Sequence, residues 1–173
     1  MIKKRREHLA CGSYRKVNKD PMNKITKLVT TTIKNSSLDD HLKQKLISKS
    51  SIMSRIYGSS KIHKQGAPLR PIVNTIGSPT YNLAKYLAER LKPLIGNTFS
   101  YVKYSTHLVK MMEDWKIEEG DILTSFDVVS LYMKIPIDEA IKVIRDIVNN
   151  DETTKLVEIC LKVHILQLQR GNL

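Results

Sequence analysis

Hydrophobic residues recur every three or four positions in several stretches of the chain, which is the spacing of one helical face. The spacing predicts helices over residues 21–34, 38–49, 78–94, 105–115, 137–149 and 152–163. Asp20-Pro21 precedes the first helix, with a capping side chain and then proline at the first helical position. Ser37 and Asp40 resemble a capping box for the second helix, and Ser105 is the predicted cap of the fourth.

Two short runs of β type lie between the second and third predicted helices. Residues 55–58 and 69–73 flank a basic loop, so we expect a β-hairpin. Pro71 cannot donate a ladder hydrogen bond, which places its strand at a sheet edge. The tip and sides of this hairpin carry Arg55, Lys61, His63, Lys64 and Arg70. Such cations can hold phosphate groups, although an ordinary basic hairpin has the same appearance, and His63 alone is more typical of a surface residue than of a metal ligand.

The later part of the chain adds two further strand predictions. After a turn at 118–121, the apolar run 122–126 predicts a central strand that ends at Asp127. The alternating residues 164–173 predict a strand that enters another hairpin. Helical stretches mixed with separate hairpins favour an α+β fold.

Composition and charge limit the classes of function that the chain can have. The chain has 173 residues, 41% of them hydrophobic, which suits one globular domain, and no apolar run approaches the length of a membrane helix. Residues 1–110 hold 22 Lys and Arg against 5 Asp and Glu, a balance of +17, while residues 111–173 hold 7 against 12, a balance of −5. We therefore expect a surface that binds phosphates beside a part that can hold cations.

The cysteines and the first residues bear on location. Cys11 and Cys160 stand far apart and form no pattern, which predicts a reduced, intracellular protein. The start, Met1-Ile2-Lys3-Lys4-Arg5-Arg6, is basic but lacks the apolar segment of a secretory signal. It is either a nuclear address or a solvated basic terminus. The expected location is intracellular and nuclear.

Asp127 is the candidate for chemistry. Phosphoryl transfer by two metals needs carboxylates close together, and aspartate at the end of an apolar strand is unusual enough to need a reason. A structural reason, the capping of the following turn, is equally consistent with the residue alone.

The surrounding residues carry a resemblance to a known family. Ser125-Phe126-Asp127-Val128-Val129-Ser130-Leu131-Tyr132 closely resembles the first catalytic palm motif of the reverse transcriptases of Penelope-like retroelements. Further segments resemble the same family in the same order, from about residue 13 onward: Tyr14-Arg15-Lys16, Lys19-Asp20-Pro21, Arg55-Ile56-Tyr57-Gly58, Lys61-Ile62-His63-Lys64, Pro68-Leu69-Arg70-Pro71-Ile72-Val73 and the run 77–88. The resemblance implies the fingers and the front of the palm of a right-hand polymerase over 51–173, after a basic arm and helical region over 1–50.

The resemblance also implies roles for single residues. Asp127 would bind two catalytic Mg²⁺ ions together with the backbone carbonyl of Val128, and Tyr132 would be the steric gate beneath the deoxyribose. Arg70 would contact the triphosphate, helped by either Lys61 or Lys64. From their place on the predicted basic hairpin, and not from the resemblance, Arg55 and His63 are candidate contacts for nucleic acid. The implied partners are an RNA template, a DNA primer and deoxynucleoside triphosphates, with no membrane.

This sequence departs from the family pattern in ways that limit its predicted activity. Ser59-Ser60 and Met133-Lys134 replace the Leu-Pro and Thr-Asn that the family usually has at these places. In the family two later motifs follow the Phe-Asp-Val-Val-Ser stretch, a Gly-Ser-Pro segment and an Asp-Asp hairpin that supplies the other metal-binding carboxylates, and neither occurs after Tyr132 in this sequence. We therefore expect a fragment of an RNA-directed DNA polymerase that is inactive alone. The alternative is a non-catalytic RNA- or DNA-binding remnant of a retroelement.

Overall fold

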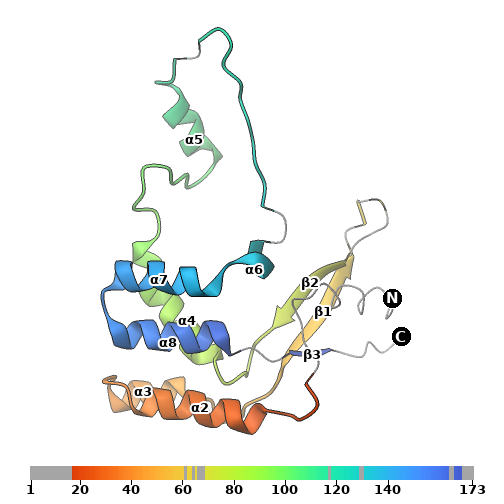
Figure 1. The fold of residues 1–173 in the computed structure, drawn as a ribbon, viewed down its shortest axis with the longest axis vertical. Helices are drawn as coiled ribbons and strands as arrows, with labels where there is room; N and C mark the ends of the chain where they lie inside the picture. The colour runs from red at the N-terminus through yellow and green to blue at the C-terminus, as the bar shows by residue number, and fades with distance from the viewer. Residues whose placement is uncertain are drawn as a thin grey trace.

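The computed structural model describes residues 17–60, 62, 63, 65, 69–116, 118–128, 131–163 and 166–168. The elements follow in the order α2 (Met22–Lys34), α3 (Asp40–Leu46), β1 (Ser54–Ser60), β2 (Leu69–Asn74), α4 (Tyr81–Leu91), the 3-10 helix η1 (Lys92–Leu94), α5 (Ser105–Met112), α6 (Leu131–Lys134), α7 (Ile137–Val148), α8 (Asp151–Lys162) and β3 (Leu166–Leu168). Figure 1 shows a body of helices with the sheet beside it, and a long excursion that carries α5 away from both.

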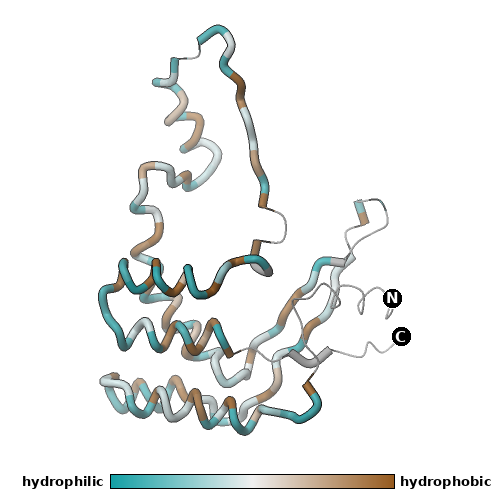
Figure 2. Tube along the Cα trace, viewed as in Figure 1, coloured by the Kyte–Doolittle hydropathy of each residue, from teal (hydrophilic) through white to brown (hydrophobic). Residues whose placement is uncertain are grey.

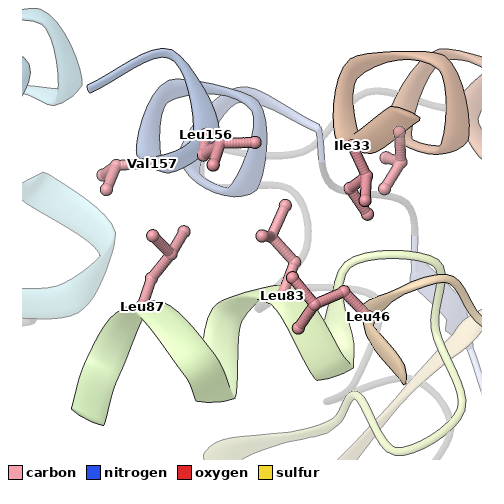
Figure 3. Close-up of a cluster of buried hydrophobic side chains, with 7 residues drawn as sticks. Ile33, Leu46, Leu83, Leu87, Leu156 and Val157 are labelled. Carbon is pink, nitrogen blue, oxygen red and sulfur yellow. The ribbon is translucent and has the colours of Figure 1, made fainter. Parts of the chain in front are cut away.

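The helices form where the hydrophobic spacing predicts them, and α8 joins several of them because it packs against α2, α4 and α7. Their shared core consists of aliphatic side chains that are at most 5% exposed: Val29, Ile33, Leu46, Leu83, Leu87, Leu156 and Val157. Figure 3 shows Leu83 and Leu87 on one side of α4, facing α8. The core thus draws on residues before and after position 50. Cys160 lies partly buried beside it, and burial raises the pKa of its thiol to about 12.

Helices α7 and α8 form an antiparallel pair that is closed by polar contacts. Asn149 ends α7 in the left-handed conformation with φ 46°, and the Asn150 side chain caps α8 by accepting a hydrogen bond from the amide of Thr153 at 2.7 Å. Asp138 in the first turn of α7 pairs with Lys162 in the last turn of α8 at 3.0 Å. The Asp138–Lys162 pair holds the start of α7 against the end of α8, and the two asparagines shape the connection between the helices.

The sheet has the strand order β2-β1-β3. Strands β1 and β2 are antiparallel and form the predicted hairpin, and Pro71 lies in β2 at the edge, as expected. The predicted last strand is confirmed over Leu166–Leu168, but its partner is the distant β1, with which it pairs in parallel. A hairpin after that strand falls on residues 169–173, which lie outside the described part of the chain.

The predicted central strand over 122–126 is wrong. A strand needs a neighbour for its ladder hydrogen bonds, and this segment belongs to no sheet among the described residues. It lies instead in the excursion, which we call the arm (residues 95–128). The hydrophobic side chains of the segment 122–126 are open to solvent, with Ile122 and Leu123 each 86% and Phe126 90% exposed. Figure 2 shows hydrophobic residues along much of the arm.

Two predicted caps are also wrong, for reasons that the geometry makes clear. Helix α3 begins later than expected, and Asp39 caps it by accepting a hydrogen bond from the amide of Leu42. Ser37 does not cap α3, because its amide and its hydroxyl both donate to Glu152 instead. Ser105 lies inside α5, which follows Tyr104 without a side-chain cap. Within the described ranges, no helix combines the length and apolarity that a bilayer crossing requires.

Candidate nucleic-acid interface

The hairpin brings Arg55 and Arg70 onto the same face of the sheet. In the β1–β2 register Arg55 stands opposite Asn74 and Arg70 opposite Ser59. Directly paired residues share a face, and side chains alternate along each strand. Arg55, Tyr57 and Ser59 therefore lie on the face that also carries Arg70. We call it the arginine face, and it consists of Arg55, Tyr57, Ser59, Arg70, Ile72 and Asn74.

Both arginines are available to a ligand. Each is exposed, and neither takes part in the ion pairs found among the described residues, which join Lys43 to Asp40 and Lys162 to Asp138 and Glu158. Since Arg70 is paired with a position four residues beyond Arg55, the two lie about 13 Å apart along the strands, at about 3.3 Å per residue. Two unpaired guanidinium groups at this spacing can contact separate phosphates of one nucleic-acid strand.

Tyr57 is the residue that the sequence reasoning missed. It lies between the arginines on β1 and is 39% exposed. An accessible aromatic ring next to cations is the usual platform for an unpaired base. The alternation Arg-Ile-Tyr already contained the signal, because residues two apart on a strand share a face. The opposite face of β1 carries Ile56, which is 5% exposed and anchors the strand.

The other predicted cations come from the segment of sequence between β1 and β2. His63 lies in a turn there and is exposed to solvent. Lys61 and Lys64, one of which was expected to assist Arg70 at a triphosphate, fall outside the described residues. The hairpin therefore places Arg55, Arg70 and His63 on one projection from the body of helices (Figure 1).

Asp127 occupies a different setting from the one expected. It is exposed and lies in the irregular end of the arm, just before α6. The neighbouring Val128 is 60% exposed. Tyr132 lies in α6, and its side chain is outside the described part of the structure. Asp127 and Val128 thus end the arm and Tyr132 lies in α6, and none of the strands among the described residues contains them.

A pair of Mg²⁺ ions needs more carboxylates than this setting supplies. Across the described residues, no three His, Cys, Asp or Glu side chains come together in a way that could hold a metal ion. Asp127 therefore stands as one exposed carboxylate, whereas two-metal chemistry requires a shared set of ligands. The described residues therefore do not fit a site for two Mg²⁺ ions.

The acidic side chains gather on the arm instead. Residues 113–127 hold six carboxylates, Glu113, Asp114, Glu118, Glu119, Asp121 and Asp127, against the single cation Lys116. Gly120 turns this segment with φ 102°, and the Asp121 side chain accepts a hydrogen bond from the amide of Glu118 at 2.9 Å. The predicted turn at 118–121 is confirmed. This stretch repels a polyanion, whereas the arginines of the hairpin attract one.

Comparisons with family models, with curated proteins and with solved structures find no match for the chain.

Proposed function

We propose that the chain is part of a reverse transcriptase of the Penelope-like type, comprising fingers and the front of a palm, and that by itself it binds RNA or DNA without polymerising. The order of the resembling segments supports this proposal, from Arg55-Ile56-Tyr57-Gly58 through the Phe-Asp-Val-Val-Ser stretch around Asp127. The β1–β2 hairpin is formed by the segments that resemble the fingers. The parent reaction is the attack of a primer 3′-hydroxyl on a deoxynucleoside triphosphate along an RNA template.

The proposed binding function rests on the arginine face. Arg55 and Arg70 would contact phosphates, while Tyr57 would stack against an unpaired base between them. All three side chains approach the ligand from one side of the hairpin, as the strand register requires. Contacts of this kind recognise the backbone and the flat face of a base, so the expected binding is independent of sequence and weakens as salt rises.

The proposed lack of independent catalysis follows from the surroundings of Asp127. By the resemblance, Asp127 and the Val128 carbonyl would hold Mg²⁺, Tyr132 would select deoxyribose, and Arg70 would contact the triphosphate. Among the described residues Asp127 belongs to no group of three or more His, Cys, Asp or Glu side chains that could hold a metal ion. The chain would supply the nucleotide-facing hairpin and the first motif of the site, while the remaining carboxylates would come from elsewhere.

A second candidate function is a non-catalytic RNA- or DNA-binding remnant of a retroelement, located in the nucleus. The positive balance of residues 1–110 favours it independently of Asp127. The two functions differ in what happens when the missing palm motifs are supplied. A reverse-transcriptase part gains activity that depends on Asp127, whereas a binding remnant does not.

The test uses one preparation of the full chain in two assays. Fluorescence anisotropy with a labelled single-stranded RNA at two salt concentrations measures binding, and primer extension on an RNA template with Mg²⁺ measures synthesis. We expect salt-sensitive binding and no extension. Metal-dependent extension by the chain alone would contradict the proposed lack of catalysis, and absence of binding at low salt would contradict the proposed function as a whole.

A further inference from the structure

Ser37 connects two distant parts of the helical body. Its backbone amide donates to Oε1 of Glu152 and its hydroxyl donates to Oε2 of the same carboxylate, although the two residues are 115 positions apart. The contact ties the connection between α2 and α3 to the first turn of α8. The hydrogen bonds from Ser37 hold the pKa of Glu152 below its ordinary value. We call this contact the Ser37–Glu152 clasp.

The structure distinguishes Ser37 from its neighbour, which the sequence does not. Ser36 and Ser37 each have an aspartate three positions later, Asp39 and Asp40 respectively. Ser36 is only 8% exposed, and its hydroxyl donates to the carbonyl of Ile33 at 2.6 Å. Ser37 is exposed in an irregular segment between two helices. An enzyme that modifies serine hydroxyls in the folded protein can therefore reach Ser37 and not Ser36.

We propose that Ser37 is a phosphorylation site for a protein kinase that prefers acidic substrates, and that the phosphate opens the clasp. In the reaction the Ser37 hydroxyl oxygen attacks the γ-phosphorus of ATP, a new O–P bond forms, and the bond to ADP breaks. The hydroxyl proton passes to the base of the kinase. The acidic side chains that follow Ser37 suit a kinase with a basic substrate groove, because charge patterns of this kind set substrate choice.

The phosphate removes the clasp for two physical reasons. The esterified oxygen no longer has a hydrogen to donate to Glu152, and the added charge of about −1.5 to −2 repels that carboxylate. The nearby cations do not offset this repulsion. Lys43 and Lys155 act on Glu152, but Lys43 already contacts Asp40 at 3.4 Å, and Asp39 and Asp151 add further negative charge. We therefore expect phosphorylation to break the Ser37–Glu152 clasp and loosen the α2–α3 connection against α8, while the shared core stays packed.

The first test maps the modification. The purified full chain is incubated with ATP and a kinase directed to acidic sequences, and the sites are assigned by tandem mass spectrometry. We expect phosphate on Ser37, none on Ser36, and none at either position in the Ser37→Ala variant. Phosphate on Ser36 in the folded chain, or an unmodified Ser37, would overturn the assignment.

The second test measures the clasp. We expect Ser37→Asp and the phosphorylated chain to unfold about 2–4 °C lower than the unmodified protein, the shift of a modest local loss in a domain of this size. Glu152→Lys should restore the midpoint in the Ser37→Asp background, because opposite charges then face each other. A Ser37→Asp midpoint equal to that of the wild type, or no recovery with Glu152→Lys, would show that phosphate does not act through Glu152.

Discussion

Removal of the two guanidinium groups tests the arginine face with a quantitative expectation. In the variant Arg55→Ala/Arg70→Ala, the hairpin keeps its strand pairing because both side chains are exposed and unpaired among the described residues. Each arginine that neutralises a phosphate of a single strand contributes about 0.7 to the slope of log K against log salt. The variant should therefore lower the magnitude of the slope by about 1.4.

The same relation gives the loss of affinity at each salt concentration. Two lost phosphate contacts weaken binding about 70-fold at about 50 mM salt and about tenfold at about 200 mM, because counterion release contributes less as salt rises. The difference between the two losses, about sevenfold, is the signature of contacts with phosphate. A loss of affinity that is equal at both salt concentrations would instead come from contacts that release no counterions.

The assay is anisotropy of a labelled single-stranded RNA titrated with protein at several salt concentrations. The matched control is Lys142→Ala/Arg145→Ala, which removes two exposed cations from α7 and so changes the net charge equally. We expect the control to keep a slope close to that of the wild type. Equal slopes for the wild type and the Arg55→Ala/Arg70→Ala variant would refute the reasoning, as would an equal change in both variants.

Three further predictions concern stability and the arm. Leu83→Ala should lower the free energy of unfolding by about 2–5 kcal/mol in urea titrations, since Leu83 is fully buried in the core; a loss below about 1 kcal/mol would contradict that packing. The pKa of Glu152 is lowered, so its contribution to stability is present above the ordinary value of 4.5 and is lost as the pH falls through the folded-state pKa. Glu152→Gln should flatten that acid limb of the melting temperature, and an unchanged limb would show that Ser37 does not stabilise the carboxylate. Brief digestion with chymotrypsin should cut first in the arm, at Phe126 among other sites, and initial cleavage inside α4 or α8 would argue against an uncovered arm.

The sequence predicts the helices well because their signal is local. A helix forms its backbone hydrogen bonds within its own segment, and its hydrophobic stripe shows which side is buried. Leu83 and Leu87 illustrate this, since they stand at helical spacing within the predicted helix 78–94 and both are buried in the structure. The β1–β2 hairpin is also local enough to follow from alternation and from Pro71 at the edge.

The sequence fails where a feature depends on a distant partner. The run 122–126 has the composition of a strand, yet no strand lies beside it in the described structure. Ser37 is a residue type that commonly caps helices, but its amide and its hydroxyl both donate to Glu152, which lies far along the chain. Pairing and contacts across the chain are not visible in local patterns. The shared face of Arg55 and Arg70 likewise requires the register of β1 against β2.

The most direct test of the proposed binding function is a crosslinking map. A single-stranded RNA that carries a photoreactive base is irradiated with the full chain, and the crosslinked peptides are sequenced by mass spectrometry. Because Tyr57 lies between the two arginines and stacking brings the base against its ring, we predict crosslinks within β1, centred on Tyr57. Crosslinks confined to the acidic arm or to α8, with none in β1 or β2, would contradict the account.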